Sequence, residues 1–561
     1  MLSSLLAPIF AWALEPKQKA EPPPVFDEAD SPDQAAFAPE VSIFDPTQLT
    51  RKTDDDVPPL AQAAAHLLLM EAFWTWKDKV TTGETGTKLL GLFSYGDDHL
   101  QWDDEKRSRQ LFSALVEVAL PRFYRWWSAA HQRLPRGEDV ELPESLLPPL
   151  DVMIIWHGYM LQPGLYADDC ARLGVPRMCR ISFPWQAIFN AIDLETLNYT
   201  IPQSAREFWD SISEEPVDLI TQLTTANRDL VYYNIHCPYC ETTKKAPVLT
   251  TLQTDNINLG FELQCDCGCK PSVDALYRDL LRVRQSGEMC LRGTYLSRSL
   301  GDALRSLAGS MSEAELASNR NPDQFVHAIH AAAARSNTPG WAVERMLDLY
   351  IPTSPVTKAA SSHYASVLRS FRFVEKMHEL SWLRSPALYS VAHSSSPPEG
   401  VVGTLPRGQQ KYRDFLKLVR QADSASVTPT TDIDLFWHTH QLSPGPYRQC
   451  CIRHVGRFMN HDDKVAEESL TQSFDNTQEL YIQQFGGEYD GCLCWPCEME
   501  RNDRDAAGKG GPSVTKERQD WNRRVCVVFW QEVESRRQEN RRGLDRTSLD
   551  KVLARGPQLA A

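Results

Sequence analysis

Two stretches of the chain follow one pattern, and this internal repeat constrains the fold more than any other feature of the sequence. Aligning Trp156 with Trp437 gives an offset of 281 and nine identities within 23 positions. The identical residues are Pro148, Asp151, Trp156, His157, Leu161, Pro163, Gly164, Tyr166 and Cys170 in the first stretch, and Pro429, Asp432, Trp437, His438, Leu442, Pro444, Gly445, Tyr447 and Cys451 in the second. Upstream, RFYRWW at 122–127 has a counterpart in KYRDFL at 411–416. Self-similarity of this kind indicates a duplicated structural unit, and two copies are too few for a periodic solenoid.

The spacing of apolar residues around both stretches is typical of helices, whereas a Cys-rich segment between them contains short β-favouring runs such as APVLTTL. We therefore predict a mainly α fold, in which a duplicated helical unit carries a small β zinc-ribbon-like insertion between its copies. The predicted parts are a Pro-rich, acidic, disordered tail at 1–58, a first helical repeat at 59–235, a Cys-rich module at 236–275, a helical region at 276–393, a loop at 394–408, a second helical repeat with a Cys cluster at 409–500, and a charged C-terminal helix and tail at 501–561.

Composition excludes some classes of protein. A formal net charge of -15 argues against a chain built mainly to hold nucleic-acid phosphates. Eight of the 14 cysteines lie in two tight clusters and the others are scattered, which is more typical of metal binding than of an extracellular disulfide framework. The apolar N-terminus lacks the basic residue and the cleavage site of a signal peptide, and no apolar run is long enough for a membrane span. We expect a cytoplasmic or nuclear protein.

The second Trp-His stretch, PTTDIDLFWHTHQLSPGPY, predicts a helix of about three turns. Thr431 or Asp432 is a candidate N-cap, and Pro444 prevents the helix from continuing past Ser443. The residues predicted to form its core-facing side are Ile433, Phe436 and Trp437.

His438 has two readings. In the functional one it joins Cys451 and His461, and this His/Cys/His set binds a metal or supports thiol chemistry. In the structural one it is a buried histidine in a helix packing seam, with the Asp434 carboxylate four residues earlier fixing its tautomer. His440 lies roughly 200° around the helix from His438, so the two histidines do not easily chelate one ion.

The Cys-rich module offers ligands for zinc. Cys237 and Cys240 form a CPYC knuckle, and Cys265, Cys267 and Cys269 follow as CDCGC. Two thiolates at this spacing reach one tetrahedral ion, and two such pairs on a small sheet resemble a zinc ribbon. Which of the last three cysteines bind stays open, and the alternative is a reduced cysteine-rich loop.

Two features near the C-terminus are less specific. Cys492, Cys494 and Cys497 supply three candidate thiolates without an evident fourth ligand, and the alternative is a set of packed thiols. Residues 501–546 hold 12 Lys and Arg against 8 Asp and Glu, which suits either RNA contact or a solvated helix face.

Taken together, several motifs resemble the glycine-rich domain-containing protein-like family. They are the repeated D-x-x-x-x-W-H-x-[HY]-x-L-x-P-x-x-Y, FPW at 183–185, FVEKMHELSWLRSPAL at 373–388 and NHDDKV at 460–465, and the final C-x-C-W-x-C-E fits the fungal branch. The resemblance covers most of residues 60–500. It implies a conserved domain of undefined biochemical activity, with plant relatives linked to development and stress responses and, in some, an RNA-binding motif.

The chain also departs from that family. It has only 28 glycines and no glycine-rich tract, so any role of such a tract does not carry over. Tyr159 stands in the first repeat where His440 stands in the second, so a His-x-His function is available to one copy alone.

Three functions follow from these features. The leading hypothesis is a non-enzymatic scaffold or interaction protein with protein partners and a structural zinc site, because the distinctive residues suit packing and zinc folding. The alternatives are an RNA-associated regulatory protein acting through the basic tail and a metal- or thiol-dependent enzyme using His438, Cys451 and His461.

Overall fold

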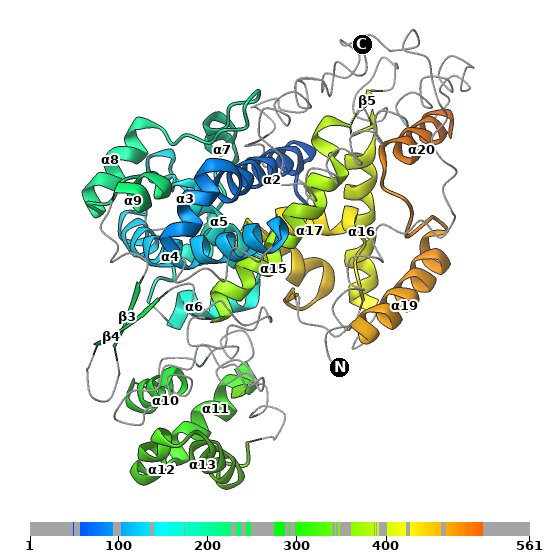
Figure 1. Ribbon diagram of the computed structural model, residues 1–561. Coiled ribbons are helices and arrows are strands. Elements are labelled where there is room, and N and C mark those ends of the chain that lie inside the picture. Colours follow the sequence, from blue (N-terminus) through cyan, green and yellow to red (C-terminus); the bar gives the residue numbers. More distant parts are fainter. Residues whose placement is uncertain are drawn as a thin grey trace.

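A computed structural model of the chain shows a mainly helical protein (Figure 1). The structure describes residues 49, 56–93, 103–134, 140–172, 174–225, 232–236, 243–247, 274–286, 291, 298–338, 343, 346–347, 361–385, 387–388, 390–391, 401–421, 427–461 and 467–508. None of the helices in these ranges is long and apolar enough to cross a membrane.

The first half of the described chain consists of helices with one short pair of parallel strands. Its helices are α2 (Leu60–Thr81), α3 (Gly83–Phe93), α4 (Asp104–Arg133), α5 (Leu150–Met160), α6 (Pro163–Arg172), α7 (Trp185–Ala191), α8 (Gln203–Ile212) and α9 (Leu219–Thr225), with 3-10 turns η6 (Glu144–Leu146) and η7 (Met178–Arg180). The strands are β1 (Val140–Glu141) and β2 (Ile181–Ser182).

The last third is helical as well. Its elements are α15 (Ser361–Leu380), η11 (Trp382–Arg384), the antiparallel strands β5 (Ser390–Val391) and β6 (Val401–Val402), α16 (Thr404–Gln421), α17 (Thr431–Gln441), α18 (Pro444–Cys450), the π-helical turn η12 (Cys451–Val455), α19 (Glu467–Phe485) and α20 (Trp495–Gly508).

The described elements between these two parts are an antiparallel strand pair and a small helical group. They are β3 (Tyr232–His236) and β4 (Thr243–Pro247), followed by α10 (Asp274–Ser286), α11 (Arg298–Ser310), α12 (Glu313–Ala317), η10 (Ser318–Arg320) and α13 (Pro322–Arg335). Helices α10 to α13 share an apolar core separate from the main one, and Figure 1 shows them as a group of their own.

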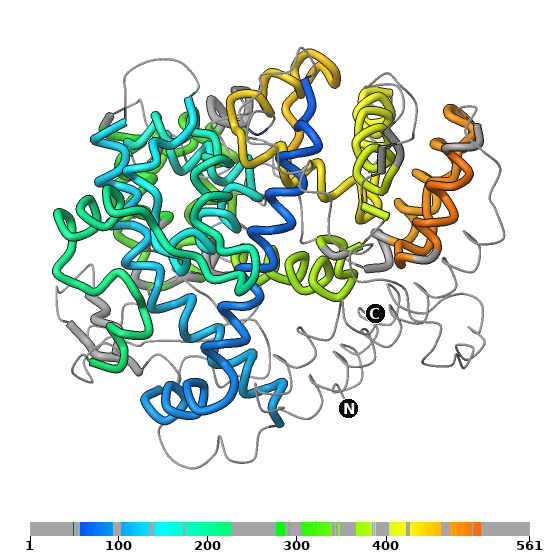
Figure 2. Tube along the Cα trace, turned by 90° about the horizontal axis from the view of Figure 1, so that it is seen from above, coloured from blue at the N-terminus to red at the C-terminus, as the bar shows by residue number. Residues whose placement is uncertain are grey.

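Helix α2 is the central helix of the main core. Its LAQAAAHLLLMEAF stretch is apolar almost all round, and a helix of that kind is stable in water only when other elements cover it on every side. Figure 2 shows α2 running between the first-half helices and the helices of the last third. Two polar residues, His66 and Glu71, are buried with it. Both halves therefore pack onto one helix.

The described elements differ from the predicted division of the chain at three places. Two described residues before position 59 contact the helical part: Leu49 is buried and its carbonyl accepts a hydrogen bond from Gln62, and Asp56 pairs with Arg453. The predicted loop at 394–408 ends early, since α16 already begins at Thr404. Helix α20 begins at Trp495, inside the stretch assigned to the second repeat.

Candidate functional site

The two Trp-His helices have the same bounds once the offset of 281 is applied. Helix α5 covers 150–160 and α17 covers 431–441, and each is followed by a helix that begins at a proline. The N-cap of α17 is Thr430 rather than the predicted Thr431 or Asp432, and its side chain does not cap the helix. The predicted core residues Ile433, Phe436 and Trp437 are buried.

Each tryptophan of the pair begins the same chain of hydrogen bonds. The Trp156 indole donates to the Tyr166 hydroxyl over 3.2 Å, and Tyr166 donates to the carbonyl of Met178 over 3.2 Å. In the other stretch, the Trp437 indole donates to Tyr447 over 2.8 Å, and Tyr447 donates to the Met459 carbonyl over 2.9 Å. The Trp, Tyr and Met of the first series each differ by 281 in number from their counterparts in the second. Each series of hydrogen bonds holds a Trp-His helix against the segment that follows it.

A buried ion pair also occurs at the start of each helix. The Arg122 guanidinium of α4 contacts Asp151 at 2.6 Å, and the Lys411 ammonium of α16 contacts Asp432 at 2.7 Å. Arg122 and Lys411 are the first residues of RFYRWW and KYRDFL. Burial raises the pKa of Asp151 despite Arg122. Burial also acts to raise the pKa of Asp432, but Lys411 and the Thr430 hydroxyl hold it below the usual value.

The histidine of the first motif belongs to a bonded series that joins the two halves. The Thr439 hydroxyl of α17 donates to the Leu435 carbonyl over 2.6 Å, so it accepts from His66 Nδ1 at 2.9 Å. A neutral His66 protonated at Nδ1 has a free lone pair at Nε2, which accepts from His157 Nε2 at 2.8 Å. Burial lowers the pKa of both histidines, that of His157 to about 3. Each imidazole is neutral and has a defined tautomer.

The histidine of the second motif lies in a different pair. His438 Nε2 lies 3.1 Å from His461 Nε2 and 3.9 Å from Asp434 Oδ1, too far from the carboxylate for the predicted direct hydrogen bond. The three donor atoms lie within 4.8 Å of one another, close enough to reach one metal ion. Burial lowers the pKa of His438, and burial raises that of Asp434 to about 7, with Lys376 acting in the opposite direction.

Cys451, the third candidate, lies outside this group, and so does His440, which was not expected to share an ion with His438. The Cys451 thiol contacts the Tyr447 hydroxyl and is not part of the Asp434, His438 and His461 group. His440 points to the Tyr412 hydroxyl, 3.0 Å from its Nδ1. Of the three candidate residues, the structure thus brings His438 and His461 together, and it adds the carboxylate of Asp434 to them.

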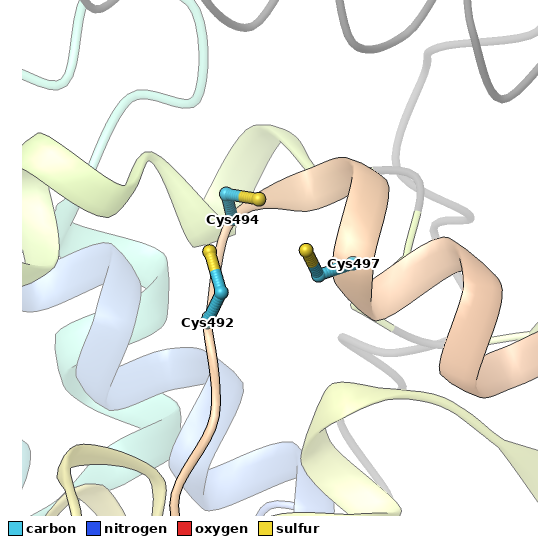
Figure 3. A group of neighbouring side chains, drawn as sticks. All are labelled: Cys492, Cys494 and Cys497. Carbon is cyan, nitrogen blue, oxygen red and sulfur yellow. The ribbon is translucent and has the colours of Figure 1, made fainter. Parts of the chain in front are cut away.

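A second group of ligand atoms is formed by the last cysteine cluster. Figure 3 shows the side chains of Cys492, Cys494 and Cys497 converging, and their sulfurs lie within 4.8 Å of one another. Hydrogen bonds from the other two thiols lower the pKa of Cys492, and the same contact raises that of Cys497 to about 11. The chemistry of this group is that of soft, metal-binding sulfur.

The predicted zinc ligands Cys237, Cys240, Cys265, Cys267 and Cys269 lie outside the described residues. The strands β3 and β4 flank the CPYC knuckle in the sequence. Residues 509–546, which contain most of the basic tail proposed to contact RNA, also lie outside the described residues.

Sequence reasoning missed His66. It lies in an apolar helix with no motif around it, and its two partners are 91 and 373 residues away. The available signal was a lone imidazole at the centre of AAAHLLL, where a polar group requires a partner once it is buried.

The comparisons with known proteins support the family resemblance. Residues 404–449 match the family described as Glycine-rich domain-containing protein-like. The chain is 30% identical over 114 residues to Glycine-rich domain-containing protein 1 of Arabidopsis thaliana. The aligned region covers 19% of this chain and 14% of that protein. It is 33% identical over 87 residues to Glycine-rich domain-containing protein 2 of the same plant, covering 14% of this chain and 11% of the relative. The matched part therefore spans about a seventh or less of either relative. No solved structure matches the chain significantly.

Proposed function

We propose that this chain, a relative of the glycine-rich domain-containing proteins, is a non-enzymatic scaffold or interaction protein. The observation that supports this most directly is that the first Trp-His motif is used to hold helices together in the core. Trp156 and His157 are buried, and through His66 the His157 ring connects α5 to α17. An imidazole held neutral in a buried series of hydrogen bonds is poorly suited to exchange protons with a substrate.

The scaffold rests on a duplicated helical unit. The matching helix bounds support this part of the proposal, as do the repeated Trp–Tyr–carbonyl bonds. The ion pairs support it independently, because Arg122 and Lys411 come from a part of the sequence outside the nine identities. Chance similarity would not reproduce a hydrogen-bond chain and a helix boundary at the same offset of 281. The paired cations Arg122 and Lys411 differ by 289, so the ion pairs repeat in type and place but not at that offset.

A structural zinc ion in the module at 236–275 completes this proposal, with Cys237, Cys240 and two of Cys265, Cys267 and Cys269 as ligands. The proposed compartment is cytosol or nucleus. The described cysteines are all free thiols, which suits a reducing compartment. Fluorescence microscopy of the tagged full chain tests this location.

The test of the scaffold proposal measures folding and partner binding in the same variant. His157→Ala removes one partner of His66, so we expect a lower melting temperature and a recovery of co-purifying proteins that falls in proportion to the folded fraction. His327→Ala is the matched control, since that ring is exposed and bonded only to the backbone of its own helix. Loss of partners at an unchanged melting temperature would contradict the structural role and make the motif a contact site.

One observation favours a second candidate, a metal-dependent enzyme. Asp434, His438 and His461 supply one carboxylate and two imidazoles within 4.8 Å, a donor set found in catalytic sites of zinc and non-haem iron. The Nε2–Nε2 separation of 3.1 Å suits both a hydrogen bond and two ligands of one ion. Metal analysis separates the two readings, because His461→Ala lowers bound metal only if the ion is there.

A further inference from the structure

The C-terminal cysteine group is built by two adjoining segments of unlike structure. Cys492 and Cys494 lie in the non-helical stretch before α20, and Cys497 lies in the first turn of that helix. The three sulfurs point toward a common space (Figure 3). Cys492 is exposed, whereas Cys494 is buried and Cys497 half-buried, so one side of the group faces solvent.

The surroundings hold the sulfurs in place. The indole of Trp382 donates to the carbonyl of Leu493 over 3.0 Å, and the indole of Trp495 donates to the carbonyl of Leu380 over 3.0 Å. These reciprocal bonds fasten the residues between the cysteines to the end of α15. A site fastened in this way is ordered before any ligand arrives, which lowers the cost of binding.

The surroundings also suit negative charge on sulfur. The backbone N–H of Cys494 hydrogen-bonds the Cys492 sulfur, and Cys497 lies at the amino end of a 14-residue helix, where the dipole favours anions. The Arg501 guanidinium donates to the Cys492 carbonyl and lies close enough to act on its thiol. Arg501 also contacts Glu498 at 2.6 Å, which fixes its position.

We propose that Cys492, Cys494 and Cys497 bind one zinc ion, with a solvent molecule as the fourth ligand on the open side of Cys492. Sulfurs about 2.3 Å from a tetrahedral zinc lie about 3.8 Å from one another, which fits a group whose sulfurs are all within 4.8 Å. Three thiolates on one divalent ion leave a single negative charge. The Arg501 guanidinium lies beside it and is shared with the carboxylates of Glu488 and Glu498. This site is separate from the module at 236–275 and goes beyond the scaffold proposal.

The zinc ion has a definite structural task. Glu498, one residue after Cys497, accepts hydrogen bonds from Thr404 at 2.6 Å and from Arg407, both on α16. Fixing the first turn of α20 therefore also fixes its contact with α16. The rival for the same thiols is a disulfide, since only two residues stand between Cys494 and Cys497 in the sequence.

The experiment uses the full chain purified under reducing conditions with zinc present. Zinc per chain is measured by elemental mass spectrometry in the parent protein, in Cys492→Ser and in the triple Cys492→Ser, Cys494→Ser, Cys497→Ser protein. We expect the triple variant to lose about one equivalent. A Cys237→Ser, Cys240→Ser protein is the control for the other module, and it keeps the zinc of this site. Cys492 is exposed, so its single substitution removes one zinc ligand without removing a buried side chain, and we expect it to lower the bound zinc.

A second readout does not depend on any variant. Alkylation of the parent protein, mapped by peptide mass spectrometry, should spare the three cysteines until a chelator is added and label all three afterwards. Equal zinc in the parent and triple-variant proteins would overturn the proposal. So would labelling of all three cysteines before chelation, or recovery of a disulfide-linked peptide from protein kept under reducing conditions.

Discussion

His66 and His157 share a hydrogen bond of 2.8 Å between their Nε2 atoms, although 91 residues separate them in the sequence. Such a bond exists only while at least one ring nitrogen is unprotonated. Burial lowers the pKa of His66 well below 6.5 and that of His157 to about 3, so both rings stay neutral in the folded chain. The contact between α2 and α5 is therefore sensitive to acid.

We expect the free energy of unfolding to fall as the pH decreases from about 6.5 toward 3. Over this window the unfolded chain protonates His157 near its ordinary pKa of 6.5, whereas the folded chain does not until about pH 3. The unfolded state binds more protons, so acid favours it, and His157 alone accounts for about 2 kcal/mol lost at pH 5. Urea titrations at pH 7, 6 and 5 measure the effect.

The contribution of His157 is isolated by comparing slopes. The His157→Gln protein should lose less stability between pH 7 and pH 5 than the parent chain. Asp434, with a pKa raised to about 7, acts in the opposite direction, but it is present in both proteins and cancels in the comparison. Parallel curves for the parent and His157→Gln would show that His157 does not titrate as stated.

Removing the buried cation Arg122 should cost more stability than removing Lys411. Arg122→Met leaves Asp151 buried without its partner and also removes donors to Gln222 and to the Val217 carbonyl, so we expect a loss of about 3–5 kcal/mol. Lys411→Met should cost less, because Lys411 is more exposed than Arg122. Chemical denaturation measures both. Equal losses would mean that burial does not set the cost of these pairs.

The sequence predicted local structure well and distant contacts poorly. The helices around Trp156 and Trp437 could be predicted because apolar spacing and Pro444 act within a few residues. His461 could be proposed as a partner of His438 by residue type alone, because it comes from a later segment and spacing on a helix says nothing about that return. The direct bond predicted from spacing, to Asp434, is absent, since that carboxylate lies 3.9 Å away. Cys451 was a reasonable candidate by type, yet its side chain contacts Tyr447 instead.

The packing of α5 against α15 should be sensitive to one added methyl group. A Cβ at Gly158 of α5 would lie 2.9 Å from Val367 Cα and 2.6 Å from Ser370 Oγ, both on α15. We expect Gly158→Ala to destabilise the fold by about 1–3 kcal/mol, because backbone has to move. Gly91→Ala is the control: a Cβ there meets nothing within 4 Å, and the change should stabilise helix α3 by about 0.5–1 kcal/mol. Thermal melting distinguishes the two directions.

The duplication proposal predicts matched losses at matched positions. Tyr166→Phe and Tyr447→Phe each remove a hydroxyl that accepts from an indole and donates to a carbonyl, so each should cost about 1–3 kcal/mol. Tyr199→Phe is a control that loses a single bond, to the carbonyl of Pro148, and should cost less. A large loss at one of the matched tyrosines and none at the other would argue against equivalent units.

His438 is where the scaffold and the metal-enzyme readings give opposite results. As a structural residue, its buried ring packs edge-on against Phe373 at 4.4 Å and bonds His461, so His438→Ala leaves a cavity and costs on the order of 2–4 kcal/mol. The partner variant His461→Ala should then destabilise less, because that ring is only half-buried, and neither change should alter bound metal. If His438 and His461 are metal ligands, substitution of either should reduce the metal bound per chain, and Asp434→Asn should reduce the same metal. Melting temperature and metal content measured on these three variants decide the matter, and we expect the stability loss at His438 with the metal content unchanged.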